Sequence, residues 1–530
     1  MRLIAPSLRL GIFIFVAAIP LLYAGGKPEQ RLIRLQAPLP LSFQELVTAA
    51  TVDPLPPDVQ RKLDTLLSEP FISNEATLRG AKPKRPEAGR LGPVLRIAEW
   101  NINRGENQRE ITLALTNAEK FEAAVRATGK VGRKKLRRIR DELHALESAD
   151  VIVLDEVDDG VKRTDYRNVT RDLAQALDMN YAYGVEFIEL NGIYLGAKQL
   201  DTVDLPRQKR ESEVFEVNPH RYLGLEGSAI LSRYPIRSAT IVRLPQVHDW
   251  YHGEIKAISD LERVRRWSAE RLFQERILRQ VRRGGRMALV ADLEVPESPT
   301  GILTFVCPHL ENYSPAEGRR KQMDALLEGI RANANPVVVA GDFNTTGHDG
   351  TPVTIKRALL SYIGDYHFWA RQIFYFLVPA PGLGYIFAGA NYFKNLHDPT
   401  AFNVPIFAAN REKQLFADTR MFRFDDGGSF SFDTSPRRSF HHKGRTLADS
   451  NQRAWKGFAT TFSFARTYHG LVGKYKIDWF FVKPPRVERP NLLEPYFGRT
   501  LHDVNTALGK RISDHSPITV DLPLRAFTPR

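Results

Sequence analysis

The chain is short of cysteine and of long apolar runs. Its 530 residues include one cysteine, Cys307, which excludes an intrachain disulfide framework and a cysteine-rich zinc site. The sequence has no internal repeat. The apolar run from Leu10 to Ala24 is about 15 residues long, which is shorter than the roughly 20 residues that a membrane-spanning helix needs.

The same run has the layout of an export signal. Two arginines precede it and two glycines follow it. A charged lead and an apolar stretch of this length are typical of signal peptides. We therefore predict that residues 1–24 are a signal peptide cleaved after Ala24, or an uncleaved N-terminal anchor, with a buried first helix as the alternative. The protein is then expected to be exported, as a periplasmic, secreted or membrane-anchored protein.

The composition is that of a globular protein, with 43% hydrophobic and 26% charged residues. The formal net charge of +14 favours anionic partners such as nucleic acid, acidic lipid head groups or phosphate esters. A basic surface can also serve solubility alone. The length suits one large domain with insertions, or about two to three domains.

The order of predicted elements indicates the fold. Proline is dense in residues 25–93, which we interpret as a lead-in, either a partly ordered linker or a strap, with one helical pattern around Val59 to Leu67. In residues 94–524, helices are interleaved with strands, and several strands follow each other directly. That order predicts a mixed α/β (α+β) sandwich, with two mostly antiparallel sheets packed face to face and helices outside.

Polar side chains stand at the ends of six predicted strands. They supply four carboxylates, two amides and two imidazoles, from Asn101, Glu156, His309, Asp342, Asn344, Asp478, Asp514 and His515. A single pattern of this kind is usually only a turn. Six strand ends that share one chemistry predict one common site, provided that the ends meet at one rim.

This set of side chains suits phosphate ester hydrolysis. Hard divalent cations such as Mg²⁺ prefer oxygen ligands, which Glu156, Asp514 and the amide of Asn101 can supply. Asp342 can orient or deprotonate a water for in-line attack at phosphorus. Asn344 can hold that water or the charge that develops on a phosphate oxygen. Histidines with carboxylate partners can move protons and bind phosphate.

Six short motifs occur in a fixed order: EWNI, LDEV, HLEN, GDFN, KIDWFFV and SDHSP. Together they resemble the endonuclease/exonuclease/phosphatase superfamily, over about residues 94 to 524. The resemblance implies a DNase I-like four-layer sandwich and hydrolysis of phosphoric ester bonds. It also implies a metal cofactor, Mg²⁺, with Mn²⁺ or Ca²⁺ as alternatives.

The resemblance also implies roles for single residues. It makes Glu156 the main metal ligand, with Asn101 beside it and Asp514 as a second acidic group near the metal. Asp342 and Asn344 match the water-orienting acid and the phosphate-binding amide of the superfamily.

The histidines match the superfamily as well. His515 corresponds to the catalytic histidine, and Asp478 to the carboxylate that orients it. His309 is similar to the histidine of the DNase I and neutral sphingomyelinase branch, where abasic-site endonucleases carry tyrosine. In DNase I-like members this histidine pairs with a glutamate, and Glu226 stands in the matching place. Asn103, in the turn after the first strand, is expected to touch substrate.

Two insertions enlarge the domain, at about 249–283 and about 350–465. The second contains an aromatic, apolar stretch, 366–393, which Pro379 and Pro381 interrupt, so a single spanning helix is not expected. Three interpretations stay open for this stretch. It is a buried subdomain core, which we favour, a membrane-interface element or a partner surface.

The sequence therefore predicts a metal-dependent hydrolase of phosphate esters, in particular phosphodiesters, that acts outside the cytoplasm as a monomer. Its basic charge fits nucleic acid and phospholipid head groups alike. No base-reading motif is present, and a nonspecific nuclease needs none, because phosphate contacts supply most of its affinity. The alternatives are a sphingomyelinase-like lipid phosphodiesterase at a membrane surface and a catalytically inactive binding module on the same fold.

Overall fold

The computed structural model describes residues 32–129, 131–193, 217–255, 280–345, 412–432, 453–454, 457–468 and 472–527, and the isolated positions 267, 271, 274, 369, 373 and 438. The predicted signal or anchor, 1–24, lies outside these residues, as do most of the insertions at 249–283 and 350–465. Among the described helices, none combines the length and the apolar character that crossing a membrane requires.

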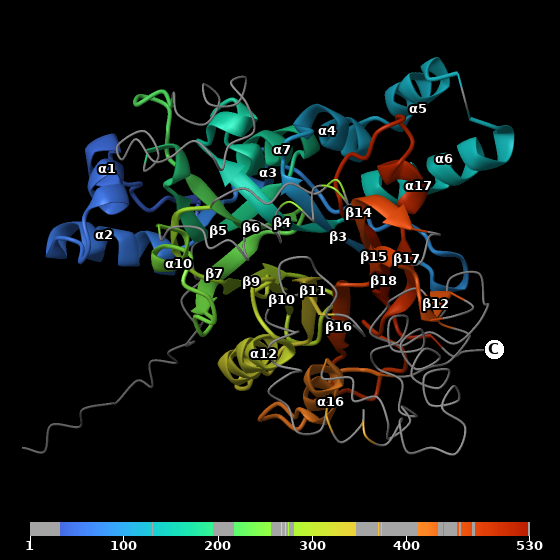
Figure 1. Cartoon of the computed structure of the whole chain (residues 1–530). Helices are drawn as coiled ribbons and strands as arrows, with labels where there is room; N and C mark the ends of the chain where they lie inside the picture. Colours follow the sequence, from blue (N-terminus) through green and yellow to red (C-terminus); the bar gives the residue numbers. More distant parts are fainter. Residues whose placement is uncertain are drawn as a thin grey trace, which may run out of the picture. The chain divides into compact units, whose positions relative to one another are not determined.

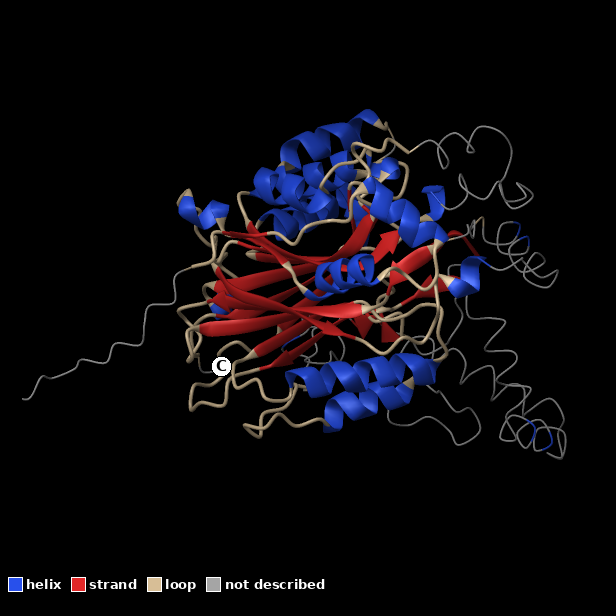
Figure 2. Ribbon diagram, turned by 90° about the vertical axis from the view of Figure 1, so that its left-hand side faces the viewer, coloured by secondary structure: helices blue, strands red, loops and turns tan. Residues whose placement is uncertain are grey.

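Two β-sheets lie face to face, and helices cover the outer face of each (Figure 2). Among the described residues the larger sheet has nine strands, in the order β1-β2-β5-β6-β4-β3-β18-β17, with β8 paired to β5. Its strands are β1 (Leu35–Gln36), β2 (Phe71–Ser73), β3 (Val94–Arg104), β4 (Val151–Asp159), β5 (Asn180–Glu189), β6 (Leu225–Ser232), β8 (Arg282–Gly284), β17 (Tyr496–Thr500) and β18 (Ile518–Pro523).

The smaller sheet has the order β16-β11-β10-β9-β7. Its strands are β7 (Ile236–Arg243), β9 (Met287–Glu294), β10 (Ile302–Pro308), β11 (Val337–Asp342) and β16 (Asp478–Lys483). Within the described strands, the pairs β3–β4 and β10–β11 are parallel and the other pairs of the two sheets are antiparallel. The predicted mixed sandwich with mostly antiparallel sheets is confirmed.

Helices form the two outer layers (Figure 1). The large sheet carries α4 (Gln108–Thr116), α5 (Ala118–Ala127), α6 (Arg133–Glu147) and α7 (Val169–Leu177), and the small sheet carries α12 (Ala316–Ile330) and α16 (Lys413–Met421). Along α6, the apolar stripe of Leu136, Ile139, Leu143 and Leu146 is buried, as the sequence predicts. Most of its basic side chains remain exposed, so its basic run is a solvated helix face.

Short elements complete the described chain. They are α1 (Phe43–Thr51), α2 (Pro57–Ser68), α3 (Glu75–Leu78), α10 (His252–Ile255), α17 (His502–Asn505), the 3-10 turns Gly89–Leu91 and Lys162–Thr164, and the pairs β12 (Arg453–Ala454) with β13 (Gly457–Phe458) and β14 (Phe462–Tyr468) with β15 (Val472–Tyr475).

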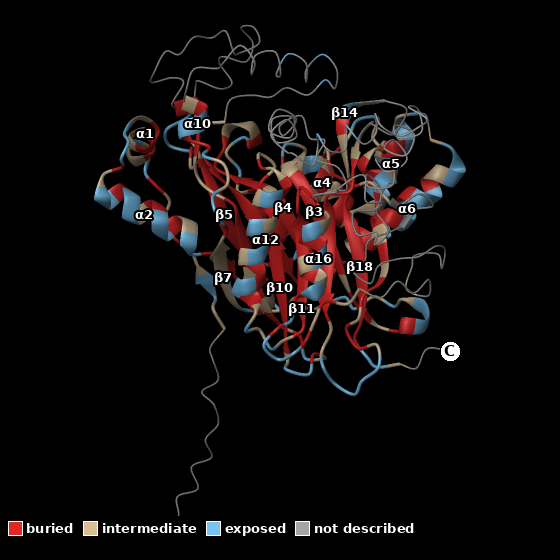
Figure 3. Cartoon of the chain, turned by 60° about the horizontal axis from the view of Figure 1, so that its bottom comes forward, coloured by how far each residue is buried: buried red, intermediate tan, exposed pale blue. Residues whose placement is uncertain are grey.

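The apolar core between the sheets fixes the strands that carry the site. Ile97 and Val153 of the large sheet pack in one buried cluster with Leu289, Phe305 and Val338 of the small sheet. Figure 3 shows both sheets as buried, whereas α12 and α16 keep an exposed outer side. Close packing of this kind resists displacement, so the ends of these strands are held in defined positions.

Residues 33–93 are part of the sandwich and do not form a free linker. β1 pairs with β2, and β2 pairs with β5, so the segment extends one edge of the large sheet. The helical pattern around Val59 to Leu67 corresponds to α2, which buries Val59, Leu63 and Leu66. The two strands have only two and three residues, too few to show an alternating pattern in the sequence.

Candidate active site

The strand ends that carry the predicted site residues meet at one end of the two sheets. The parallel strands β3 and β4, like the parallel strands β10 and β11, run toward this end. β16 starts there, so its first residue, Asp478, lies opposite Asp342, the last residue of β11. Asn101 of β3 links the sheets, because its Nδ2 donates a hydrogen bond to Oδ2 of Asp342 over 3.2 Å.

Three strands of the large sheet are bulged at this end, the adjacent strands β3 and β4 and, beyond β6, β5. The pairing register shifts after Asn101 on β3, after Leu154 on β4 and after Val185 on β5. A β-bulge bends its strand and re-aims a side chain. The bulges place Glu156 and Glu186 at the site, and Glu156 has a left-handed φ of +52°. Such a conformation is uncommon for glutamate and frequent at functional sites, where the surrounding structure maintains it.

His515 is oriented by a carboxylate. Its Nδ1 donates to Asp478, 2.8 Å from Oδ1 and 3.0 Å from Oδ2. Its Nε2 then faces Asp342, 3.7 Å from Oδ2. Nε1 of Trp100 donates to the main-chain oxygen of His515 over 3.0 Å and fixes the backbone. Burial acts to lower the pKa of His515, but Asp478 and Asp342 outweigh it and raise the pKa well above its ordinary value.

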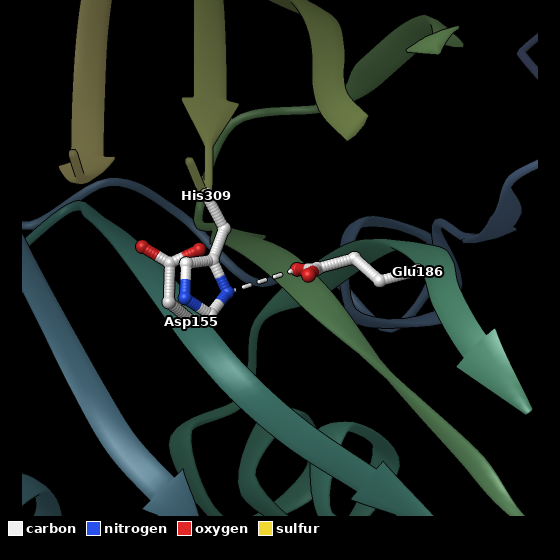
Figure 4. Close-up of side chains that lie close together, drawn as sticks. All are labelled: Asp155, Glu186 and His309. Carbon is white, nitrogen blue, oxygen red and sulfur yellow. Dashed lines mark hydrogen bonds and ion pairs between the residues drawn. The ribbon is translucent and has the colours of Figure 1, made fainter. Parts of the chain in front are cut away.

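His309 is oriented by a second carboxylate, Glu186. Nδ1 of His309 lies 3.2 Å from Oε1 of Glu186, and Figure 4 shows this glutamate reaching the ring from β5. Nε2 of His309 faces the site, 3.8 Å from Oδ2 of Asp342 and 4.0 Å from Oε1 of Glu156. The two histidines therefore face the same oxygen of Asp342 from two histidine–carboxylate pairs.

The prediction that Glu226 is the partner of His309 is wrong. Glu226 is buried, but its Oε1 accepts a hydrogen bond from Arg282 over 3.0 Å. On β6, the residue that faces Glu186 is Ser228, whose Oγ donates to Oε1 over 2.7 Å. Glu226 is two positions farther along the strand, roughly 7 Å away. The bulge on the neighbouring strand turns Glu186 into the place that Glu226 was expected to occupy.

A buried arginine completes the second pair. Nη1 of Arg286 donates to Oε2 of Glu186 over 2.7 Å and lies against the His309 ring. Burial and Arg286 act to lower the pKa of His309, but Glu186 and Asp155 outweigh them and raise it to about 9. Burial acts to raise the pKa of Glu186, but His309 and Arg286 lower it to about 2. Near neutral pH the pair is therefore a carboxylate and an imidazolium.

The donors around Glu156 fit a hard divalent cation. Burial acts to raise the pKa of Glu156, but Arg104 and His309 outweigh it and lower the pKa, so this carboxylate is ionised. Nδ2 of Asn101 donates a hydrogen bond to Oε1 of Glu156 over 3.3 Å and so orients this carboxylate. Burial and the nearby charge of Glu156 raise the pKa of Asp514, which His515 opposes. A cation would offset this crowding of acids, and oxygen donors are the ligands that Mg²⁺ prefers.

Two further groups of acids with a histidine occur among the described residues, with ligand atoms within 4.8 Å of one another. They are Asp155, Glu186 and His309, and Asp342, Asp478 and His515. In each group the histidine is already paired with a carboxylate. Asp155 also supports the end of β11, because its Oδ2 accepts a hydrogen bond from the main-chain N–H of Asp342 over 2.8 Å. The carboxylate of Glu156 at the rim lies outside both groups.

Asp342 and Asn344 project from one turn, as their spacing predicts. The main-chain N–H of Asn344 donates to Oδ1 of Asp342 over 2.8 Å, and its Nδ2 donates to the oxygen of Leu310 over 3.0 Å. Asn103 is placed similarly, with its N–H 3.0 Å from Oδ1 of Asn101. Asn344 and Asn103 have left-handed φ values of +45° and +46°, which asparagine tolerates better than most residues. The turn after β11 thus holds the Asn344 amide beside the Asp342 carboxylate.

The sequence reasoning missed Glu186 and Arg286. Glu186 interrupts the largely apolar run Asn180–Glu189, and an acid inside a buried strand is a signal for a site residue. Arg286 follows Arg282 and Arg283 in a short basic run, and nothing in the sequence separates it from them. Its burial and its contact with Glu186 are visible only in the folded chain.

A sequence profile of the endonuclease/exonuclease/phosphatase family matches residues 98–515. No curated protein matches the chain. Among solved structures, it is similar to an endonuclease/exonuclease/phosphatase from Beutenbergia cavernae DSM 12333, with 15% identity, 82% of this chain and 72% of that chain covered, and a TM-score of 0.36.

It is also similar to D. rerio TDP2 humanized by 14 mutations, with 14% identity, 81% and 98% of the two chains covered, and a TM-score of 0.31. A third similar structure is the human Nocturnin catalytic domain with bound sulfate, with 12% identity, 81% and 93% covered, and a TM-score of 0.33. The profile match covers more than half of the chain and includes the site residues from Asn101 to His515. The chain belongs to the endonuclease/exonuclease/phosphatase family.

Proposed function

We propose that the protein is a metal-dependent phosphodiesterase. The observation that carries this proposal is the placing of two histidine–carboxylate pairs, His515–Asp478 and His309–Glu186, around Oδ2 of Asp342 at 3.7 Å and 3.8 Å. Two oriented imidazoles and an acid on one centre can supply the proton transfers and the charge stabilisation of in-line attack on a phosphoric ester.

The acid and the amide prepare the nucleophile. Burial raises the pKa of Asp342, which makes its carboxylate a better proton acceptor than an exposed aspartate. Asp342 accepts the proton of the attacking water as its oxygen bonds to phosphorus. Asn344, held beside it by the turn, donates to the water or to a phosphate oxygen.

The histidines act on the other oxygens of the phosphate. The carboxylate partners keep His515 and His309 protonated near neutral pH, with Nε2 directed into the site. Each ring can donate to a phosphate oxygen, and either can pass its proton to the leaving oxygen when the phosphorus–oxygen bond breaks. Glu156 and Asp514 would hold Mg²⁺, which when bound supplies Lewis-acid polarisation of a phosphate oxygen, and Asn101 would orient Glu156 through its Nδ2.

The substrate and the location are part of the same proposal. The net charge of +14 supports an anionic diester such as nucleic acid, and the apolar run within residues 1–24 supports export. A monomer is sufficient for this chemistry, because one chain supplies every residue named above.

A lipid phosphodiester is the second candidate. In the stretch 366–393, the two described side chains, Trp369 and Ile373, are 51% and 57% exposed, and the rest of the stretch lies outside the described residues. Exposed apolar side chains on a chain with a net positive charge favour a membrane interface. Vesicle co-sedimentation of a Trp369→Ser, Ile373→Ser variant tests this role. A Leu39→Ser, Leu78→Ser variant, altered at two exposed side chains elsewhere, is the control.

A substrate panel tests the function itself. Purified protein with Mg²⁺ is incubated with plasmid DNA, RNA, sphingomyelin vesicles and a chromogenic phosphodiester. We expect turnover of a diester, with the preferred substrate deciding between nuclease and lipid phosphodiesterase. His515→Ala and His309→Ala should each lower the rate by roughly 10²–10⁴-fold, with non-additive effects in the double variant. No turnover on the whole panel with Mg²⁺, Mn²⁺ or Ca²⁺ would favour an inactive binding module.

A further inference from the structure

Arg104, the last residue of β3, lies beside the Glu156 carboxylate. Oε1 of Glu156 accepts the hydrogen bond of Asn101 and lies 4.0 Å from Nε2 of His309. Both of these residues also contact Asp342. The other oxygen, Oε2, lies 4.0 Å from Nε of Arg104. The two oxygens of this carboxylate therefore face different groups, the catalytic centre at Asp342 and the guanidinium of Arg104.

The guanidinium of Arg104 has unused hydrogen-bonding capacity. Its contacts with acids are made by Nε, 3.7 Å from Oε2 of Glu226 and 4.0 Å from Glu156, and both distances exceed the length of a hydrogen bond. Nε is buried without a hydrogen-bond partner among the described residues. A buried N–H group without a partner costs free energy unless a water or a ligand satisfies it. The side chain is 23% exposed, so a molecule in the site can reach it.

Two other arginines contact the same glutamate, and each is hydrogen-bonded to an acid. Arg282 donates to Oε1 of Glu226 over 3.0 Å. Arg163 donates to Oδ2 of Asp158 over 2.7 Å and to Oε2 of Glu226 over 3.4 Å. Glu226 therefore accepts hydrogen bonds at both oxygens from these two arginines. Of the three, Arg104 is left without a hydrogen-bonded acid in the described part of the chain.

The backbone holds Arg104 in a strained turn. Asn103, Arg104 and Gly105 have consecutive left-handed φ values of +46°, +66° and +80°. The turn is fixed by the N–H of Asn103, which donates to Oδ1 of Asn101, and by the N–H of Gly105, which donates to the oxygen of Ile102 over 3.1 Å. A left-handed φ is uncommon for arginine, and such strain occurs where a side chain must be presented at a functional site.

We propose that Arg104 binds a second phosphate of a nucleic acid strand, next to the phosphate that is cleaved at Asp342. The inference rests on the proposed function and names its substrate. A guanidinium presents its N–H donors in a fork that matches the oxygens of a phosphate. A nucleic acid strand carries one phosphate per nucleotide, so neighbouring phosphates can occupy the sites on the two sides of Glu156. Sphingomyelin has a single phosphate and supplies no anion for the second site.

Binding of a fluorescein-labelled oligothymidylate in EDTA tests the proposal without turnover. Fluorescence anisotropy is measured at several salt concentrations for the wild type and for Arg104→Gln. The variant should bind about tenfold more weakly, as the loss of a charge-assisted hydrogen bond implies. Its plot of log K against log salt concentration should be shallower by about 0.7, the value for one lost phosphate contact with a single strand.

Turnover separates a phosphate contact from a structural role. With Mg²⁺, kcat/KM is compared for the oligothymidylate and for bis(p-nitrophenyl) phosphate, which has one phosphate. The loss in Arg104→Gln should be about tenfold or more greater on the oligonucleotide. An equal loss on both substrates would show that Arg104 only positions Glu156, and turnover of bis(p-nitrophenyl) phosphate alone by the wild type would exclude the strand as substrate; either result overturns the proposal. Failure of the proposed function is seen separately, as no hydrolysis of either substrate by the wild type.

The matched control is Arg331→Gln. Arg331 precedes β11, whose far end carries Asp342, and it pairs with Glu328 over 2.7 Å. This variant should bind the oligonucleotide with the affinity and the salt dependence of the wild type. Equal affinities of Arg104→Gln and Arg331→Gln, or no binding by the wild type, would also overturn the proposal. If Arg104→Gln does not fold, Arg104→Lys, which keeps the positive charge beside Glu226, must still weaken binding for the proposal to stand, because an ammonium lacks the fork.

Discussion

Glu186 is a site residue that the sequence reasoning missed, and Glu186→Gln isolates its charge. Glutamine keeps the shape of the side chain and removes the negative charge beside His309. Arg286 keeps a second acid, because its Nε lies 3.6 Å from Oε2 of Glu311. We therefore expect a folded protein in which the histidine has lost its main electrostatic partner.

The size of the effect follows from the pKa of His309. A pKa raised from 6.5 to about 9 corresponds to roughly 3 kcal/mol of favourable interaction with the protonated ring. In Glu186→Gln, burial and Arg286 still act to lower the pKa of His309. Of the two main groups that raise this pKa in the wild type, Glu186 and Asp155, only Asp155 remains. The pKa of His309 should then fall below its ordinary value. At pH 7.5 the ring changes from protonated to neutral.

The same shift predicts the pH dependence of stability. The folded-state pKa of His309 is above its unfolded value, so its contribution is complete below about pH 6.5 and is lost as the pH rises through about 9. The wild type should lose up to roughly 3 kcal/mol of unfolding free energy over this window that Glu186→Gln does not lose.

Two assays measure these effects. Nitrogen-15 NMR of the imidazoles in metal-free protein follows the titration of His309, and urea unfolding at about pH 6 and pH 9 follows stability. A pH–rate profile should show Glu186→Gln losing activity at pH 7.5 and recovering part of it at lower pH. A His309 that still titrates near 9 in Glu186→Gln would refute the electrostatic role of this glutamate.

Three other changes test separate parts of the account. Glu156→Gln should weaken Mg²⁺ binding and activity together while the fold is kept, and calorimetric titration with Mg²⁺ that matches the wild type would contradict the ligand assignment. Asp478→Asn should lower the rate about 100-fold or more, with an unchanged Mg²⁺ affinity, because the histidine loses its orienting carboxylate. Gly227→Ala should cost about 2 kcal/mol or more in urea unfolding, because its Cβ would lie 1.9 Å from the main-chain oxygen of Gly184. The control is Gly253→Ala, whose Cβ meets nothing closer than 3.6 Å and should change the unfolding free energy little.

Much of the site could be predicted because its residues stand at recognisable strand ends. Asn101, Glu156, Asp342 and His515 each follow or precede an apolar run, and apolar runs report strands directly. Strand pairing in the sandwich brings those ends together. The order of predicted strands and helices already implied such a sandwich. The short edge strands of residues 33–93 could not be seen, because their pairing depends on β5 and not on their own pattern.

The partner of His309 could not be predicted for a different reason. A β-bulge adds one residue to one strand and shifts which side chains face each other, and a single sequence does not show where a bulge lies. The extra residue on β5 decides which face of the sheet Glu186 points to, because a shift of one position turns a side chain to the opposite face. The buried Arg286 follows from the same local geometry.

The most direct test of metal-dependent phosphodiester hydrolysis is the release of p-nitrophenolate from bis(p-nitrophenyl) phosphate. The wild type is assayed with Mg²⁺, after removal of metal with EDTA, and after Mg²⁺ is restored, with His515→Ala measured in parallel. The account predicts turnover that EDTA abolishes and Mg²⁺ restores, and a rate for His515→Ala that is lower by roughly 10²–10⁴-fold. Turnover that persists in EDTA, or that His515→Ala retains in full, would contradict it.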